Sequence, residues 1–158
     1  MARNPAPTPR GDLLIVDALA QFSFLIQGTL EGRASEHDLS MIQTRLLGVL
    51  RDRRPTMNQL AMLLGLDKSS VTGLVDRAER RGLVARVPST TDGRAVLVTL
   101  TDAGRTSVAA VAAGFETDVA AILAALPTSD RRALSALVSR VLVAHATARG
   151  VDLFATSS

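Results

Sequence analysis

No cysteine, tryptophan or tyrosine occurs in this chain of 158 residues, and histidine occurs only twice. Without cysteine the chain can form neither a disulfide nor a thiolate metal site, and it cannot use a thiol for redox sensing. It is therefore compatible with a reducing cytoplasm. The aromatic residues are four phenylalanines. This scarcity argues against RNA recognition by base stacking, which depends on exposed aromatic side chains.

Long apolar segments are missing as well. The longest uncharged stretch rich in apolar residues, Ala18 to Leu30, is shorter than the roughly 20 residues that a membrane-spanning helix needs. The first residues, MARNPAPTPRGD, contain three prolines and lack the apolar centre of a signal peptide. We therefore expect a flexible tail at residues 1–11, no membrane association and a cytoplasmic location.

The residues that are present can build a hydrophobic core and are unevenly charged. Hydrophobic residues make up 47% of the chain, which excludes a disordered protein and is ample for one domain. The net charge is +3, but residues 51–105 alone carry +4 and the remainder carries −1. A positive excess in this segment favours a partner that carries phosphate groups.

Helical periodicity predicts two helices before this basic segment. The first runs from Asp12 to Leu30, is apolar around most of its circumference and is closed by Gly32. One small neighbour would not cover such a helix, so we expect a partner chain to do so. A polar linker then leads to a second helix, from about Leu39 to Leu50.

Residues 56–105 have the local signals of a helix-turn-helix followed by a hairpin. Thr56 and Gln59 fit a capping box that opens a short helix, and Gly65 ends that helix in the left-handed conformation. Asp67 is a good N-cap for the next helix. Apolar residues at core-facing spacing in that helix are Val71, Leu74, Val75 and Ala78.

The spacing of apolar residues changes to a period of two from Leu83 onward, which predicts a strand. A second strand is expected over residues 95–100. Between the two lies Asp92-Gly93, a strong hairpin-turn signal. The sequence thus predicts a basic hairpin, or wing, next to the helix-turn-helix.

Two more helices are expected after the hairpin. Thr101 can cap a long one that reaches about Leu126, where Pro127 breaks it. Thr128 can cap a last helix that Gly150 ends. The last helix carries an apolar stripe composed of Leu134, Leu137, Val138, Val141 and Leu142.

This order of elements resembles the MarR family of transcription regulators. The segments that carry the resemblance are LDKSSVT (66–72), LVDR (74–77), RGLV (81–84), DGR (92–94) and LTDAGR (100–105). Many relatives have a second arginine where this chain has Gly93, so one phosphate contact of the family is missing here.

The resemblance implies a mainly α-helical fold with a small two-stranded β wing. A winged helix-turn-helix would occupy residues 39–105, between flanking dimerisation helices. The implied parts are an N-terminal tail (1–11), an N-terminal dimerisation helix with its linker (12–38), C-terminal dimerisation helices (106–150) and a C-terminal tail (151–158).

The same resemblance, together with side-chain chemistry, predicts a DNA-binding set. Short hydroxyl side chains near the start of a helix can reach phosphates and base edges. Gly73 allows the helix backbone to approach DNA closely, and the guanidinium of Arg77 can form two hydrogen bonds with a guanine. The resemblance implies that Arg94 enters the minor groove and that Asp92 holds it by a salt bridge. A solvated helix face and a solvated turn are the alternatives. The predicted set is Asn58, Lys68, Ser69, Ser70, Thr72, Gly73, Arg77, Asp92 and Arg94.

Other charged residues near this set have plainer explanations. Asp76 is expected to pair with a neighbouring arginine, or to accept from cytosine, rather than to touch phosphate. Arg51, Arg53 and Arg54 follow the second helix, where cations suit the helix dipole. For these three, a solvated helix end is favoured over DNA contact.

Phe22, Phe24 and Arg45 are the predicted effector pocket. The resemblance implies a site for small aromatic or phenolic molecules between the first helix and the winged motif, and core packing is the alternative for both phenylalanines. His145 extends the last helix's apolar stripe, so we expect a packed or interface residue. A metal site needs three or four ligands, and no such set, nucleophile–base pair or phosphate loop occurs. No metal, cofactor or enzymatic activity is therefore predicted.

The predicted function is sequence-specific DNA binding by a transcription regulator. We expect a homodimer that acts as a repressor on a pseudo-palindromic operator and is released by a small aromatic or phenolic effector. The alternative is a winged-helix module that binds another protein and no DNA. The basic excess and the hydroxyl-rich helix face argue against that alternative.

Overall fold

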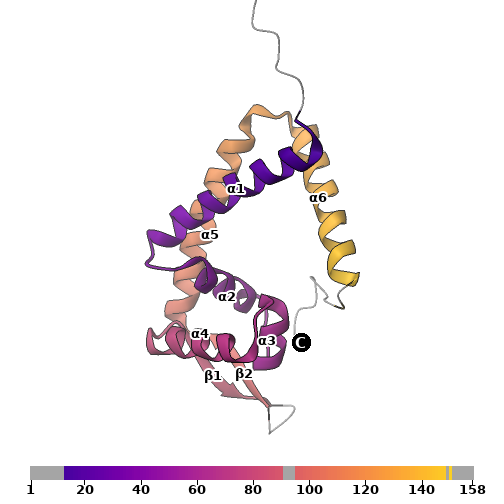
Figure 1. The fold of residues 1–158 in the computed structure, drawn as a ribbon. Helices are drawn as coiled ribbons and strands as arrows, with labels where there is room; N and C mark the ends of the chain where they lie inside the picture. The colour runs from indigo at the N-terminus through magenta and orange to yellow at the C-terminus, as the bar shows by residue number, and fades with distance from the viewer. Residues whose placement is uncertain (1–12, 91–94, 149, 151–158) are drawn as a thin grey trace, which may run out of the picture.

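Helices make up most of the computed structural model, which describes residues 13–90, 95–148 and 150 (Figure 1). The elements, in chain order, are α1 (Ile15–Ser35), α2 (Met41–Arg51), α3 (Met57–Leu64), α4 (Lys68–Arg80), β1 (Val84–Pro88), β2 (Val96–Leu100), α5 (Asp102–Ile122), the 3-10 helix η1 (Leu123–Ala125) and α6 (Thr128–Ala148). The expected fold class, mainly α with a two-stranded wing, is confirmed.

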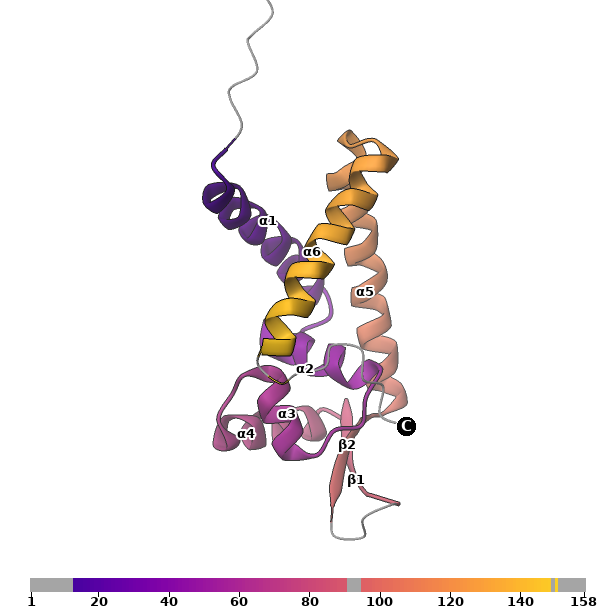
Figure 2. The same cartoon turned by 90° about the vertical axis from the view of Figure 1, so that its right-hand side faces the viewer.

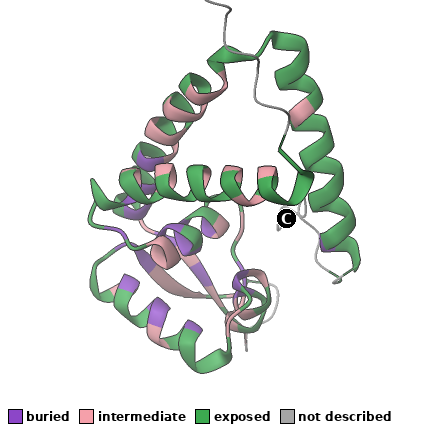
Figure 3. Cartoon of the chain, turned by 45° about the horizontal axis from the view of Figure 1, so that its top comes forward, coloured by how far each residue is buried: buried purple, intermediate pink, exposed green. Residues whose placement is uncertain are grey.

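The core lies where α2, α3 and α4 meet the two strands, and the end of α1 and the first half of α5 complete it. Figure 3 shows the buried positions gathered in this lower part of the molecule. Leu46, Leu47 and Leu60 are fully buried there. The predicted inner face of α4 is confirmed, because Val71 and Val75 are also fully buried.

Local capping fixes where the central helices begin and end. Thr56 and Gln59 form the predicted capping box, Gly65 adopts φ 67°, and the side chain of Asp67 caps α4. Ser40 forms a second capping box with Gln43 at the start of α2, a signal that the sequence analysis overlooked. These caps satisfy backbone N–H groups that the helix ends leave unpaired.

The wing is an antiparallel pair in which Val84 faces Leu100 and Pro88 faces Val96. The segment before α3 extends this pair, because the carbonyl of Pro55 accepts the N–H of Val98 at 2.9 Å. β2 therefore lies between β1 and the start of the helix-turn-helix. The predicted Asp92-Gly93 turn lies outside the described residues.

α1 extends beyond its predicted end. Gly32 does not close the helix, which continues to Ser35. Tertiary contacts account for the difference, since Ala34 is fully buried in the core and Arg33 pairs with α5. These contacts outweigh the preference of glycine for a helix end, which is worth about 1 kcal/mol. α6 likewise differs slightly, because Thr128 is its first residue rather than its cap.

The long helices surround the upper part of the molecule and leave apolar residues exposed. α1 and α5 cross above α2, and α6 descends apart from both (Figures 1 and 2). Ile15 of α1 is 75% exposed, and most residues of the predicted α6 stripe are exposed as well. A folded single chain thus keeps apolar faces in solvent on two of its helices.

One helix departs from the expectation that no segment is long and apolar enough to span a membrane. Asp102–Ala125, which comprises α5 and η1, is long and apolar enough to cross a membrane by length and composition, although no such segment was predicted. This helix also contacts α1, α2 and β2, and its Asp118 forms an ion pair with Arg33. It is therefore a component of the fold, and composition alone is weak support for a membrane span.

Candidate nucleic-acid interface

The first turn of α4 is organised around the carboxylate of Asp67. This side chain accepts the backbone N–H of Ser70 at 2.9 Å, the hydroxyl of Ser69 at 2.6 Å and the hydroxyl of Ser70 at 2.6 Å. Both serines are exposed. The cap thus holds two predicted contact residues in fixed positions at the start of the exposed helix.

The hydroxyl protons of Ser69, Ser70 and Thr72 are already donated in hydrogen bonds within the chain. Ser69 and Ser70 donate to Asp67, and Thr72 donates to the carbonyl of Lys68 at 2.8 Å. Phosphate oxygens only accept hydrogen bonds, whereas cytosine and adenine present amino donors in the major groove. In this arrangement the three hydroxyl oxygens can still accept hydrogen bonds, whereas their protons are already donated within the chain.

Gly73 and Arg77 form one stripe along the same face. A Cβ atom at position 73 would lie 3.3 Å from Nη1 of Arg77, so the guanidinium rests over the glycine. The stripe borders a shallow pocket of about 340 Å³ with apolar residues Leu66 and Leu74 in its wall. An arginine fork beside a small apolar recess offers hydrogen bonds to guanine and space for a neighbouring base edge.

Arg86 of β1 connects the wing to α4. Its guanidinium contacts Asp76 at 2.6 Å and forms a second ion pair with Glu79, whose carboxylate also accepts the N–H of Arg86. The carboxylate of Asp76, and then that of Glu79, raise the pKa of Arg86. The pairing expected for Asp76 is confirmed. Glu79 and Arg86 were missed, since no local spacing relates a helix to the following strand.

Of the remaining predicted DNA contacts, the structure describes Asn58 and Lys68. Asn58 is exposed in the first turn of α3, and Lys68 is exposed at the start of α4. Asp92 and Arg94 fall outside the described residues. The structure therefore brings together the part of the predicted set that lies on α4, with Asn58 on the preceding helix.

Comparison with known proteins shows a similarity that is centred on the helix-turn-helix. The sequence model of the MarR family matches residues 37–95. The HTH-type transcriptional regulator PecS of Dickeya dadantii (strain 3937) is 31% identical over 94 residues. Over residues 37–95 the chain is therefore similar to the MarR family. The aligned part covers 57% of this chain and 57% of PecS, so the chain spans little more than half the length of that relative.

Solved structures share the fold of this chain. MepR of S. aureus in complex with DNA has a TM-score of 0.67 and 20% identity, over 84% of this chain and 99% of MepR. NadR in complex with 4-hydroxyphenylacetate has a TM-score of 0.67 and 22% identity, over 86% of this chain and 97% of NadR. PecS is named a transcriptional regulator, which is the class of function expected from the sequence.

The residues predicted for an effector site lie on two helices, Phe22 and Phe24 on α1 and Arg45 on α2. Phe22 is half-buried on α1, whereas Phe24 is 65% exposed. Arg45 donates to the carbonyl of Leu64 at 3.3 Å, which ties α2 to the end of α3. Core packing, the alternative considered for both phenylalanines, does not describe Phe24 in the single chain.

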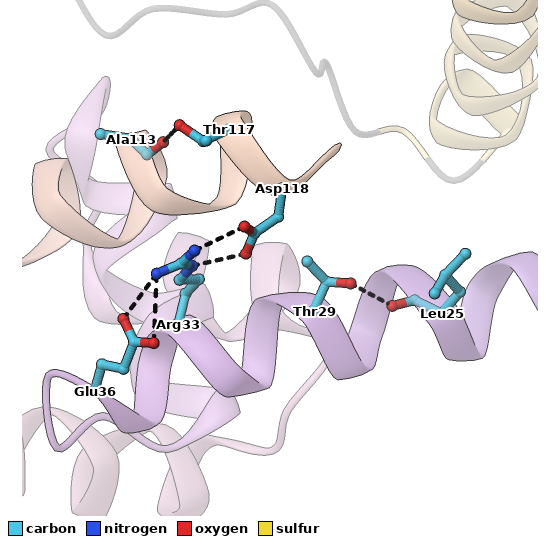
Figure 4. A network of polar contacts seen from close by, with 7 residues as sticks. All are labelled: Leu25, Thr29, Arg33, Glu36, Ala113, Thr117 and Asp118. Atoms are coloured by element: carbon cyan, nitrogen blue, oxygen red, sulfur yellow. Dashed lines mark hydrogen bonds and ion pairs between the residues drawn. The ribbon is translucent and has the colours of Figure 1, made fainter. Parts of the chain in front are cut away.

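An ion-pair network joins α1 to α5 above the DNA-binding domain (Figure 4). Arg33 donates from Nε and Nη2 to the two carboxylate oxygens of Asp118, both at 2.7 Å, and also contacts Glu36 at 3.1 Å. Arg33 lowers the pKa of the Asp118 carboxyl. A Cβ atom at Gly114 would approach Cδ of Arg33 to 2.9 Å, so this glycine makes room for the arginine.

The Asp67 cap predicts an acid-dependent loss of stability. Bonds from Ser69, then Ser70, lower the pKa of Asp67. Because the folded pKa lies below the unfolded value near 3.9, the ionised cap stabilises the fold above that pH, and this contribution is lost as the pH falls further. We expect thermal unfolding to show a smaller decrease in Tm from pH 7 to pH 3 for Asp67→Asn than for the parent. An equal decrease would contradict this role. Asp17→Asn, at an exposed acid of α1, is the control.

Proposed function

We propose that the chain is a DNA-binding transcription regulator that reads the major groove with α4. The observation that carries this proposal is the division of α4 into two faces. One face is fully buried, and the other presents the hydroxyls, Gly73 and Arg77 on a rigid, capped helix. The positive excess of residues 51–105 supports the proposal, because phosphate attraction supplies much of the affinity for DNA.

We further propose that the chain acts as a homodimer on a pseudo-palindromic operator. The exposed apolar residues of α1 and α6 support this, since a soluble monomer rarely leaves large apolar faces uncovered. A two-fold dimer would carry two copies of α4 and would match half-sites about one helical turn apart. Light scattering on the purified chain should give twice the mass of one chain.

Arg77 is the residue proposed to contact a base. Its role is tested by selecting duplexes from a random pool and then measuring the affinity of the chain for them. The parent chain should bind a selected palindrome with a Kd near the nanomolar range, and this affinity should fall steeply with salt. Arg77→Ala should weaken binding to that palindrome by about 10- to 100-fold, because a bidentate arginine–guanine contact is worth roughly 1–3 kcal/mol. Its affinity for random duplexes should change by much less.

The control for this test is Arg132→Ala, which removes the same charge from the exposed surface of α6 away from its apolar stripe. It should leave both affinities close to those of the parent. If Arg77→Ala and Arg132→Ala bind the palindrome equally well, α4 does not read bases through Arg77. If the parent shows no salt-dependent affinity for any duplex, the protein–protein alternative is favoured.

Arg94, with Asp92 as its partner, is proposed as the minor-groove contact of the wing. A narrow minor groove concentrates negative potential and attracts arginine. Arg94→Ala should therefore lower the preference for the selected palindrome over random duplexes while the Tm stays unchanged. If Arg94→Ala binds the palindrome as the parent does, the wing does not have this role.

A repressor released by a small phenolic effector is the proposed mode of regulation. NadR, which shares the fold, is described in complex with 4-hydroxyphenylacetate, and Phe22, Phe24 and Arg45 are the residues proposed here to contact such a molecule. An effector can act only by binding the DNA-competent and DNA-incompetent states with different affinities. It would then change the separation of the two α4 helices within the dimer.

A further inference from the structure

Four arginines surround a cleft on a different side of the wing from α4. The cleft has a volume of about 220 Å³ and is lined by the end of α2, the end of β2 and the first turn of α5, three elements that contact one another. Its polar wall comprises Arg51, Asp52, Arg53, Arg54, Thr99 and Arg105. We call this feature the arginine cleft. Residues 54 and 105 are far apart in sequence, so the fold itself gathers these charges.

The lining of the arginine cleft carries more positive than negative charge. Its four arginines face a single lining carboxylate, that of Asp52. Arg51 pairs with Asp52 at 3.1 Å, and both side chains are more than half exposed. Arg54 has no acidic partner among the residues that the structure describes. Since like charges repel, an anion bound between these arginines would stabilise this concentration of charge.

Two ion pairs that the structure describes at this site, Arg51–Asp52 and Arg105–Asp102, are weak enough to exchange partners. Arg105 contacts Asp102 at 2.7 Å, but the Asp102 side chain is 98% exposed. Exposed pairs of this kind contribute little, typically 0–1 kcal/mol. Arg105 is held in place independently of Asp102, because its Nη1 donates to the carbonyl of Leu100 at 2.9 Å. The guanidinium is thus already positioned when a stronger anion arrives.

Position separates the arginine cleft from the proposed DNA-reading face. β2 lies between β1 and the segment that begins at Pro55, and α4 packs on β1. The pocket beside α4 and the arginine cleft share no lining residue. The cleft therefore cannot be explained as part of the stripe formed by Gly73 and Arg77.

We propose that the arginine cleft binds a phosphoryl group. Guanidinium forks match the geometry of phosphate oxygens and form charge-assisted hydrogen bonds with them. Two sources of this chemistry are a free phosphorylated metabolite and the phosphate backbone of DNA that extends past the wing. Binding of a free phosphoryl compound goes beyond the proposed function and does not depend on it.

The first experiment measures binding of inorganic pyrophosphate to the full-length chain by titration calorimetry at low salt. The parent should show saturable binding, and Arg54→Gln/Arg105→Gln should bind at least tenfold more weakly. Arg132→Gln/Arg140→Gln removes the same charge from exposed positions on α6 and should bind as the parent does. Arg54→Gln alone provides a second cleft variant, because Arg54 makes no described ion pair whose loss could unfold the chain.

The second experiment measures the salt dependence of binding to a random duplex for the same variants. If DNA is the source, the slope of log K against log salt should be less steep in the cleft variant than in the α6 variant, by about 0.9 for each lost phosphate contact. If a free compound is the source, the cleft variant and the α6 variant should have the same salt slope and should differ only in their affinity for pyrophosphate. The proposal is overturned if the cleft variants match the α6 control in both experiments. If the parent binds no duplex, the proposed function fails and the pyrophosphate titration alone decides the cleft.

Discussion

Gly104→Ala is expected to destabilise the DNA-binding domain by about 3 kcal/mol or more, the upper range for overpacking a core. Gly104 is in the first turn of α5 and is buried. A Cβ atom at this position would lie 1.9 Å from the carbonyl oxygen of Leu83 and 2.9 Å from its carbonyl carbon. Both are backbone atoms, so no side-chain rotation can relieve the overlap.

The backbone around Gly104 is also held in place by hydrogen bonds. The carbonyl of Leu83 accepts the N–H of Thr101 at 3.1 Å, and the hydroxyl of Thr101 is within 2.6 Å of the carbonyl of Gly82. Moving α5 away to admit a methyl group would break these contacts. Leu83 joins α4 to β1, so the shift would also disturb the link between the recognition helix and the wing.

Chemical denaturation of the parent chain and of Gly104→Ala tests this expectation. Gly48→Ala is the matched control. Gly48 is an exposed position within α2, and a Cβ atom there would meet nothing within 4 Å. Because alanine favours a helix interior over glycine, the control should be unchanged or up to about 1 kcal/mol more stable. Equal stability of the Gly104→Ala and Gly48→Ala variants would show that α5 can move without cost.

The sequence predicted the features of this fold that depend on neighbouring residues. The Thr56 and Asp67 caps, the left-handed Gly65 and the buried face of α4 each follow from patterns within one or two helical turns, and all are present. Caps and periodicity act locally, so a single sequence contains the information they require.

Features that depend on distant residues were missed or misjudged. Gly32 was expected to end α1, but its neighbours Arg33 and Ala34 are fixed by α5 and by the core. Arg51 and Arg54 are exposed, as a solvated helix end requires, but nothing in their local pattern indicates that Arg105 lines the same cleft. The hydroxyls predicted to contact DNA are exposed, and their protons are donated to Asp67 and to the carbonyl of Lys68.

Arg86→Leu is expected to weaken binding to the selected palindrome by at least about tenfold, which corresponds to 1.4 kcal/mol. Arg86 is the connection between β1 and α4, and its side chain is 27% exposed. Removing it releases the wing from the recognition helix, so the two no longer approach DNA at a fixed angle. It also leaves the carboxylates of Asp76 and Glu79 without their cation, and Asp76 lies on the exposed side of α4.

These two consequences can be separated by a charge-matched control and a second substitution. Arg80→Leu removes the same charge from α4, but Arg80 bonds only to the backbone carbonyl of Asp76, at 3.4 Å, among the described contacts. It should therefore reduce affinity for palindrome and random duplex alike. Arg86→Leu/Asp76→Asn removes the unpaired carboxylate but does not restore the connection between wing and helix.

Fluorescence anisotropy with both duplexes, together with the Tm of each variant, gives the decisive comparison. If Arg86 acts mainly by holding the wing, Arg86→Leu/Asp76→Asn should remain weak toward the palindrome while its affinity for random duplexes recovers. Recovery of both affinities would instead mean that Arg86 only neutralises Asp76. If Arg86→Leu and Arg80→Leu show the same ratio of affinity for the palindrome to affinity for random duplexes, the ion pairs between β1 and α4 stabilise the domain but do not determine which sequence it prefers.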